Sequence, residues 1–226
     1  MQLDEYFGDW LTVIDQKELN NVVRQLNVVG KTKPIVPAYK DIFKAFTLCS
    51  KRDCKIIFLG QDPYPQKGVA TGVLFGNKEG TIELSPSLEI LKEAAINYEI
   101  PHMAPIKFDV TLESWARQGI LMINSALTCE MNKAGSHVML WRPFVSKLLH
   151  NLSNTSSGLV YVLFGEQAQT FEPYINKRIN SVIKVHHPAY FARTHSKMPY
   201  WVFTELNKIM MDNYGVPIKW YEESLT

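Results

Sequence analysis

The sequence contains little of what several protein classes require. It has three cysteines, at positions 49, 54 and 129, and none of them belongs to a CxxC pair. They are too few for an iron–sulfur cluster held by four thiolates or a closed all-cysteine zinc site, and we expect no metal cofactor. We expect these three thiols to be reduced, as they are in a cytosolic or nuclear protein. No stretch approaches the roughly 20 apolar residues that a membrane span needs, so a membrane partner is not expected.

An excess of charge of one sign is also lacking. The chain of 226 residues carries 24 basic and 22 acidic side chains, a net charge of +2. This excludes a strongly basic protein that coats nucleic acid, although it is compatible with a local basic patch. The first ten residues, MQLDEYFGDW, resemble neither a signal peptide nor a transit peptide. We therefore expect a cytoplasmic protein, or a nuclear or host-compartment one if the source is eukaryotic or viral.

What is present is the composition of a folded protein, 46% hydrophobic and 20% charged. Short apolar runs alternate with segments of helical periodicity, which favours an α/β fold. We predict a single domain over 1–226, a three-layer sandwich whose central four-stranded parallel sheet is flanked by helices. Residues 1–50 are expected to be mainly helical and 55–207 to form the catalytic core. The predicted strands are Lys55–Gly60, Gly119–Ala126, Leu159–Gly165 and Ser181–His187; the predicted helices include Ser87–Tyr98, Val110–Gln118, Phe144–Asn151 and Val202–Asp212.

Polar side chains follow these strands where each one ends. Right-handed crossovers place the carboxyl ends of parallel strands at one edge of the sheet, where ligands of such folds bind. An acid, an amide and an imidazole meet there, which favours an active site, although the scaffold alone does not identify a reaction. Taken singly, each residue also suits a turn or the core. The residues at these ends are Gln61, Asp62, Asn124, Gly165, Glu166, His186 and His187.

The hexapeptide at 60–65, GQDPYP, closely resembles the water-activating motif of family 1 uracil-DNA glycosylases, which read GQDPY followed usually by His. Further segments follow in the family's order: LESWARQGILMIN at 112–124, Ser-His at 136–137 with Trp141, and HPAY at 187–190. The similarity extends over about residues 37 to 207, which is far more specific than one short motif.

This resemblance implies a monofunctional glycosylase that hydrolyses the bond between uracil and deoxyribose in DNA, leaving an abasic site for base excision repair. Asp62 is then expected to stabilise the cation-like sugar and orient the attacking water, as carboxylates do in glycoside hydrolysis. His187 is expected to hydrogen-bond uracil O2 as negative charge gathers there. Water is the nucleophile, and no organic cofactor is implied.

Three further residues are expected to select uracil, with Gln61 beside them in the substrate site. Asn124 can donate to uracil O4 and accept from N3–H, a pattern that cytosine reverses. Tyr64 is expected to exclude the methyl group of thymine at C5. Phe75 resembles the family's Phe that stacks beneath the pyrimidine ring, although a Phe in an apolar run is more often part of the core.

The base must leave the helical stack to reach such a pocket, which requires a wedge and phosphate contacts. By position the resemblance assigns the wedge to Phe191, in place of the family's usual Leu. Arg193 is placed near phosphates. The other expected DNA-binding residues are Pro63, Ser85, Pro86, Ser87 and Gly165.

Three positions depart from the family's pattern. Pro65 replaces the usual His, Glu166 stands where a Ser commonly touches phosphate, and Ala189-Tyr190 replaces Ser-Pro. These changes predict weaker or differently arranged phosphate binding, while the proposed chemical residues remain. The expected partners are uracil-containing single- and double-stranded DNA and a DNA-mimicking protein inhibitor, and the expected state is a monomer.

Two alternatives stay open at this point. A non-catalytic DNA-binding or replication-accessory protein on the same fold is compatible with the altered phosphate loops. A nucleotide-binding α/β module is less consistent with the sequence, because no GxGxxG turn or P-loop follows the first strand.

Overall fold

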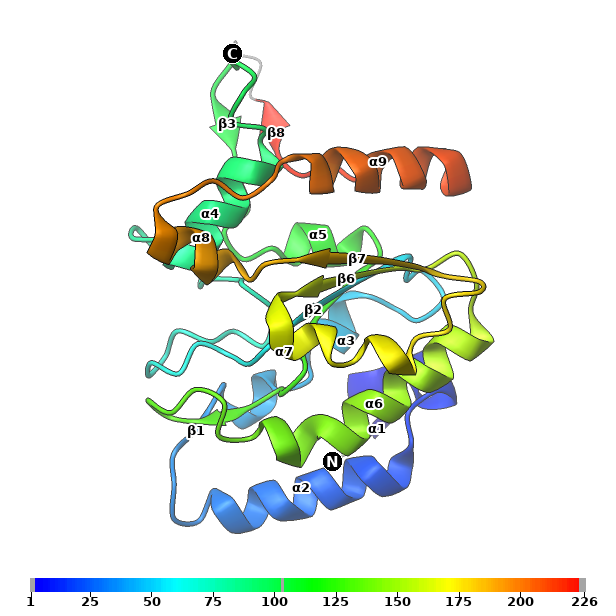
Figure 1. Ribbon diagram of the computed structural model, residues 1–226. Helices are drawn as coiled ribbons and strands as arrows, with labels where there is room; N and C mark the ends of the chain where they lie inside the picture. The colour runs from blue at the N-terminus through cyan, green and yellow to red at the C-terminus, as the bar shows by residue number, and fades with distance from the viewer. Residues whose placement is uncertain (1–2, 103, 224–226) are drawn as a thin grey trace.

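A computed structural model describes residues 3–102 and 104–223. Its centre is a parallel sheet of strand order β4-β2-β6-β7, flanked on both sides by helices (Figure 1). The sequence prediction of a four-stranded parallel α/β sandwich is confirmed. The strands are β2 (Ile56–Gly60), β4 (Ile120–Asn124), β6 (Val160–Phe164) and β7 (Ser181–Val185).

Side chains of the central strands alternate between two hydrophobic clusters, because successive residues of a strand point to opposite faces. In β2, Ile57 and Leu59 join one cluster, whereas Ile56 and Phe58 join the other. All residues of β2, β4 and β6 are buried. Strands buried on both faces appear in the sequence as continuous apolar runs, and this is why they could be predicted from the sequence.

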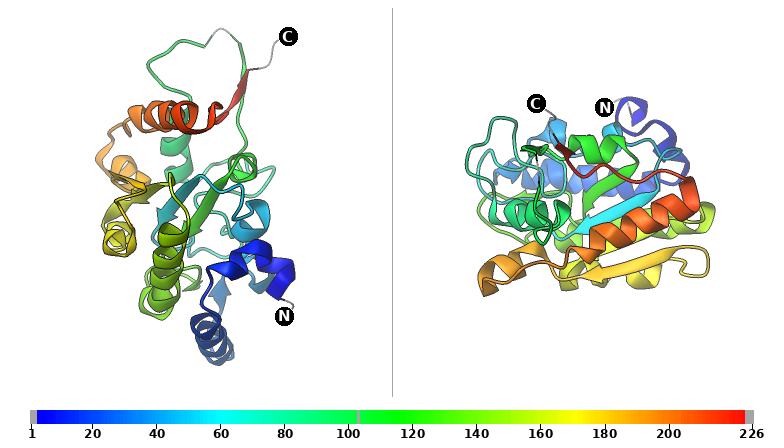
Figure 2. Two further views of the ribbon diagram at one scale, coloured as in Figure 1. Left: turned by 90° about the vertical axis from the view of Figure 1, so that its right-hand side faces the viewer. Right: turned by 90° about the horizontal axis from the view of Figure 1, so that it is seen from above.

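The first cluster lies between the sheet and the N-terminal part of the chain. Helix α2 begins after Asp15, whose carboxylate accepts a hydrogen bond from the backbone N–H of Glu18. Figure 2 shows this layer and α9 on opposite sides of the sheet. The helices of the layer are α1 (Leu3–Phe7), α2 (Gln16–Val29), α3 (Lys44–Leu48), α6 (Val138–Thr155) and α7 (Gly165–Gln169), with 3-10 turns η1 (Gly8–Thr12), η2 (Tyr39–Asp41) and η3 (Glu172–Tyr174).

The second cluster packs the opposite face. The fully buried Trp115 is at its centre, where its indole N–H donates to the carbonyl of Trp220 at 2.9 Å and ties the C-terminal segment to the core. Within the described ranges no helix is long and apolar enough to cross a membrane. The helices of this layer are α4 (Pro86–Ala95), α5 (Glu113–Arg117), α8 (Pro188–Thr194) and α9 (Trp201–Tyr214).

Several elements differ from the expected bounds. Helix α5 covers only part of the helix predicted over 110–118, because Asp109 and Thr111 hydrogen-bond the backbone in the turn before it. Helix α6 begins six residues before the predicted Phe144, despite Pro143 in its second turn. Helices α7 and α8 were not predicted. Two short antiparallel pairs lie outside the main sheet: β1 (Ile35–Val36) with β5 (Cys129–Glu130), and β3 (Ile106–Lys107) with β8 (Glu222–Glu223).

Candidate active site at the carboxyl edge of the sheet

A cavity of about 780 Å³ opens at the carboxyl ends of the parallel strands. Most of the residues that the sequence nominated line it together, although they come from segments far apart in the chain. Ser85, Pro86 and Phe191 are not among its lining residues. The nominated residues that do line it are Gln61, Asp62, Pro63, Tyr64, Phe75, Ser87, Asn124, Gly165, His187 and Arg193.

Asp62 lies directly after β2, with its carboxylate partly shielded from solvent. One carboxylate oxygen accepts a hydrogen bond from the backbone N–H of Gly135 in the loop before α6. Burial raises the pKa of Asp62 above its ordinary value, while hydrogen bonds from Gly135 and Gln61 offset part of that rise. A desolvated carboxylate interacts more strongly with a nearby positive charge than an exposed one does. This environment suits stabilisation of a cationic sugar.

His187 ends the loop after β7 and caps α8. Its Nδ1 accepts the backbone N–H of Ala189 at 3.1 Å, so in the neutral ring the proton is on Nε2. Burial, and then the charge of Arg193, lowers the pKa of His187 to about 4. The imidazole is therefore neutral near pH 7, and its Nε2–H donates to none of the described residues. That is the form required to stabilise a developing oxyanion without transferring a proton.

Asn124 is the last residue of β4, and its side chain is 9% exposed. Its Oδ1 is buried and accepts no hydrogen bond from any of the described residues. The amide lies close to Gly60 on the neighbouring strand: a Cβ at Gly60 would be 2.8 Å from Asn124 Oδ1 and 2.3 Å from a Leu74 methyl. An unpaired buried acceptor costs about 1–3 kcal/mol, so this amide is ready to accept a donor from a ligand.

Tyr64 and Phe75 are joined through the phenol. Tyr64 Oη donates to the Phe75 carbonyl at 3.3 Å and accepts from Ser85 Oγ at 2.6 Å. Burial raises the pKa of Tyr64 to about 12, so the phenol keeps its proton. The Phe75 ring meets His187 edge-on, with ring centroids 5.3 Å apart. The expected gate, stacking ring and imidazole therefore form one contiguous group.

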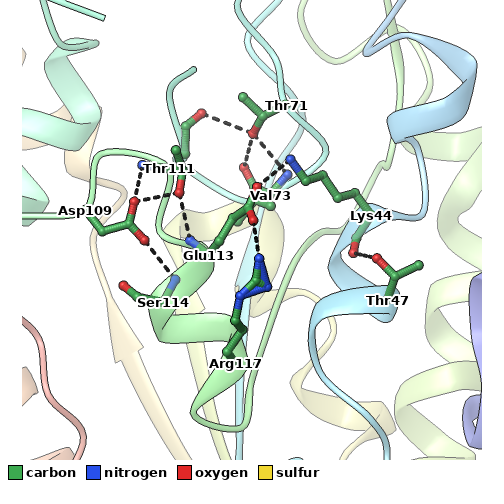
Figure 3. Close-up of polar contacts among 10 residues, drawn as sticks. Lys44, Thr47, Thr71, Val73, Asp109, Thr111, Glu113, Ser114 and Arg117 are labelled. Atoms are coloured by element: carbon green, nitrogen blue, oxygen red, sulfur yellow. Dashed lines mark hydrogen bonds and ion pairs between the residues drawn. The ribbon is translucent and has the colours of Figure 1, made fainter. Parts of the chain in front are cut away.

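The segment that presents Phe75, residues 71–76, is held by its own polar contacts. Phe75 has φ of +63°, a left-handed conformation that is uncommon for a bulky residue. Thr71 Oγ1 contacts the carbonyls of Val73 and Gly76 and accepts the N–H of Val73, as Figure 3 shows in part. Leu74 donates from its N–H to the carbonyl of Met122 in β4 at 3.1 Å. These bonds maintain the unusual backbone beneath the ring.

A second group of polar contacts supports this segment from behind (Figure 3). Asp109 accepts from the N–H and hydroxyl of Thr111 and from the N–H of Ser114, which fixes the start of α5. Glu113 pairs with Lys44 of α3 at 2.5 Å and with Arg117 at 2.7 Å. The ion pairs connect α3 and α5, and the 71–76 segment packs closely against both regions: Gly72 approaches Lys44, and Gly76 approaches Thr111 in the turn before α5.

Gly165 follows β6 with φ of +84°, and a Cβ there would lie 2.9 Å from the Cβ of His187. The glycine therefore permits the close approach of the His187 backbone. This gives Gly165 a structural reason to be glycine; a direct DNA contact at this residue stays a prediction.

The three residues at 85–87 have different environments. Ser87 is buried at the cavity, whereas Pro86 is exposed at the first position of α4. Helix α4 begins one residue before the predicted Ser87, and its N-cap is Ser85. Ser85 Oγ contacts Tyr64 and lies 3.2 Å from Oδ1 of the buried Asn77. Ser85 thus supports the Tyr64 wall from outside the cavity.

The structure does not support Phe191 as a wedge at the cavity. Its side chain is 7% exposed and belongs to the cluster that packs α8 against the core. Exposing a buried Phe side chain costs about 1.5–3 kcal/mol. The neighbouring Tyr190 is 40% exposed and lines the cavity. A helix turns about 100° per residue, so adjacent positions on α8 face different directions. The assignment of the wedge by its position after His187-Pro188 did not anticipate this difference.

Sequence reasoning missed three contributors to the site. Gly135 acts through a backbone N–H, which no side-chain pattern reveals. Thr71 acts through a local turn, for which its position before Gly72 was a weak signal. Tyr190 was noted only as a departure from the family's motif. Among the described residues no group of three or more His, Cys, Asp or Glu side chains is placed to hold a metal ion.

The profile of the uracil DNA glycosylase superfamily matches residues 46–210. A uracil-DNA glycosylase of Campylobacter jejuni is 38% identical over 197 residues, covering 86% of this chain and 83% of the relative. One of Buchnera aphidicola is 33% identical over 218 residues, covering 94% and 97%. The chain belongs to the uracil-DNA glycosylase family.

Solved structures show the same fold. A mimivirus UNG variant in complex with UGI has a TM-score of 0.82 at 23% identity, covering 97% of this chain and 90% of the other. Mimivirus uracil-DNA glycosylase has a TM-score of 0.74 at 21% identity, covering 95% and 90%. A variant from Nitratifractor salsuginis has a TM-score of 0.67 at 20% identity, covering 90% and 94%.

Proposed function

We propose that this protein hydrolyses the N-glycosidic bond of deoxyuridine in DNA, releasing uracil and leaving an abasic site for base excision repair. The observation that carries the proposal is the buried Oδ1 of Asn124, which no described residue satisfies and which lies in a cavity shared with Asp62, Phe75 and His187. The family and the names of the relatives support the same activity.

The base is recognised by hydrogen-bond polarity and by shape. The Asn124 carbonyl accepts the N3–H of uracil and its amide donates to O4. Cytosine presents an acceptor at N3 and a donor at C4, so both contacts oppose it. Each buried group left unpaired costs about 1–3 kcal/mol, which favours uracil strongly. Tyr64, fixed by Ser85 and by the Phe75 carbonyl, excludes the C5 methyl group of thymine.

The chemistry divides between a neutral donor and a carboxylate. As the bond from C1′ to uracil N1 breaks, its electron pair leaves with the base, and His187 Nε2–H donates to the increasingly negative O2. Asp62 stabilises the positive charge on the sugar and orients the water that adds to C1′. Gln61, whose side chain hydrogen-bonds Asp62, helps to hold that carboxylate in place. The products are free uracil and an abasic deoxyribose.

DNA contacts follow from the residues around the mouth of the cavity. Arg193 is exposed at this rim and is placed to meet a phosphate. Pro63, Ser87 and Gly165 line the cavity and are proposed to contact the sugar-phosphate backbone beside the flipped nucleotide. Ser85 and Pro86 contribute from the neighbouring surface, Ser85 chiefly by fixing Tyr64. We propose that the protein acts as a monomer on single- and double-stranded DNA and that a DNA-mimicking protein inhibitor binds the same face.

The exposed Glu166 at the rim favours one competing function, a DNA-binding accessory role without catalysis. One experiment separates the two. A single-stranded oligonucleotide with one deoxyuridine is incubated with the protein in EDTA, beside a matched thymidine oligonucleotide and the Asp62→Asn variant. Release of uracil by the unmodified protein alone supports the glycosylase. Absence of release, with binding to the oligonucleotide retained, would establish the accessory role instead.

A further inference from the structure

Two aromatic rings are stacked at the rim of the cavity. His186 and Tyr190 have ring centroids 4.5 Å apart and planes inclined by 20°. Both side chains are exposed and both line the cavity. They come from the end of β7 and from α8, on the edge of the sheet where the strands end (Figure 1). Exposed, parallel aromatic rings of this kind are suited to stacking on nucleobases.

The backbone around Tyr190 is fixed before any ligand binds. Its N–H donates to the His187 carbonyl at 2.8 Å, and its carbonyl accepts from Thr194 Oγ1 at 2.9 Å. Phe191 is buried beneath it, with the two ring centroids 5.4 Å apart at 86°. Tyr190 is therefore an exposed ring on a rigid support, with the His186 imidazole against one face and the buried Phe191 ring meeting both stacked rings at a steep angle.

Extrusion of a nucleotide leaves a gap in the duplex, and proteins commonly fill such a gap with an apolar or aromatic side chain. Phe191 would have to leave the core to do so, whereas Tyr190 is already at the surface beside His187. Arg193, three residues later, shares the face of α8 with Tyr190 and lines the same cavity. An aromatic ring and a cation are thus presented together where a flipped nucleotide would leave its strand.

Resting on the proposed glycosylase function, we propose that Tyr190 is the side chain that enters the stack vacated by the flipped nucleotide and that His186 positions it. The rings then form a short aromatic column, with His186 against one face of Tyr190 and a neighbouring base against the other. Phe191 supports α8 from the core and does not enter the DNA. In a single strand no partner strand holds the gap open, so Tyr190 contributes less there.

The test compares uracil release from one deoxyuridine oligonucleotide as a single strand and as a duplex. Tyr190→Ala is expected to lower the duplex rate about 5- to 100-fold relative to the single-strand rate, the range for loss of one stacked aromatic. Tyr190→Phe should restore the ratio. Phe191→Ala, which removes the ring that would enter the stack if Phe191 were the wedge, should lower the melting temperature and leave the ratio unchanged. His186→Ala should lower the ratio less than Tyr190→Ala, and His186→Phe should restore it.

A second measurement does not require turnover. Binding is measured to a duplex with one tetrahydrofuran abasic analogue and to the same strand alone. Tyr190→Ala should weaken duplex binding several-fold more than single-strand binding. If Phe191→Ala reduces the duplex preference while Tyr190→Ala leaves it intact in both assays, the proposal is overturned and Phe191 is the wedge. If the unmodified protein releases no uracil, the proposed function is overturned. Binding to the abasic duplex would still test whether Tyr190 enters the stack.

Discussion

The interior of the cavity and its rim are built differently. Inside, Asn124 and Phe75 are buried, and Tyr64 is hydrogen-bonded on both sides of its hydroxyl. At the rim, Glu166 and Arg193 are exposed, and neither appears in a side-chain hydrogen bond or ion pair among the described residues. The groups proposed to discriminate between bases are fixed in advance, whereas the groups proposed to meet the DNA backbone are left adaptable. We therefore expect base selectivity to depend on the rigid interior and affinity for the DNA strand to depend on the rim.

The departures from the family's motifs follow the same division. Glu166, Ala189 and Tyr190 all line the mouth of the cavity, and the residues proposed for chemistry and base selection are retained. Pro65 is the exception, because it lies next to the interior Tyr64. Changes at the rim are therefore expected to alter binding to DNA more than they alter the choice of base.

The largest effect is expected from Asp62→Asn. Loss of the negative charge removes its stabilisation of the cationic sugar, and we expect kcat to fall about 10³-fold. Binding to a deoxyuridine oligonucleotide should change little, because the sugar carries no positive charge before the bond breaks and asparagine has nearly the same shape as aspartate. Single-turnover uracil release and fluorescence anisotropy measure the two quantities. Full activity in the variant would remove Asp62 from the mechanism.

Asn124→Asp tests the interior directly. A protonated carboxyl can donate to N3 of cytosine and accept from its amino group, so slow cytosine release is expected. Uracil release should fall about 10²-fold because the pairing at O4 or N3 is lost. The measurement is the identity of the base released from matched deoxyuridine and deoxycytidine strands. Unchanged strict selection of uracil would show that another residue reads the base.

The pH dependence of kcat/KM tests both titrating residues. His187, with its pKa lowered to about 4, is neutral from pH 8 to pH 6, so no step is expected near the ordinary histidine pKa of about 6.5. Because the pKa of Asp62 is raised, activity should fall as pH drops and Asp62 gains a proton, by about tenfold per pH unit below its pKa. A step near 6.5 that His187→Gln abolishes would contradict the neutral-imidazole assignment.

Ser85→Ala should have a smaller effect. It removes the donor to Tyr64 Oη and leaves Asn77 without one of its partners. We expect uracil kcat/KM to fall about three- to tenfold and trace thymine release to appear, less than in Tyr64→Ala. Thr81→Ala is the control, because it removes an exposed hydroxyl whose one hydrogen bond within the described part of the chain goes to the nearby Lys78 carbonyl. Equal effects in the two variants would mean that Ser85 does not position Tyr64.

The smallest effect is expected at the rim, from Glu166→Gln. Removing this negative charge should tighten binding to single-stranded DNA about two- to fivefold at low salt, with the difference shrinking as salt is added. Glu205→Gln, an equal charge change on the exposed face of α9, is the control. Base selection should not change in either variant. Altered selection in Glu166→Gln would break the division between interior and rim.

The sequence predicted the sheet and most of the cavity because both depend on short local signals. Fully buried strands read as apolar runs, and Asp62, Asn124 and His187 each follow one. The direction of a side chain around a helix axis is set by packing, so Phe191 and Tyr190 were not distinguished. The N–H of Gly135 was not predicted because it leaves no pattern in the sequence. The single-domain organisation stays a prediction.

Gly60 has a consequence for how sequences of this family diverge. A methyl group at this position would collide with the Asn124 amide and with Leu74. A larger residue is therefore not tolerated at position 60 while Asn124 keeps its orientation. A lineage released from selection for uracil would lose that restriction. We therefore expect relatives with a larger residue at the position of Gly60 to have lost discrimination between uracil and cytosine, which assays of such natural variants can measure. A glycine without chemistry of its own thus records, in sequence, whether the base-reading amide is still in use.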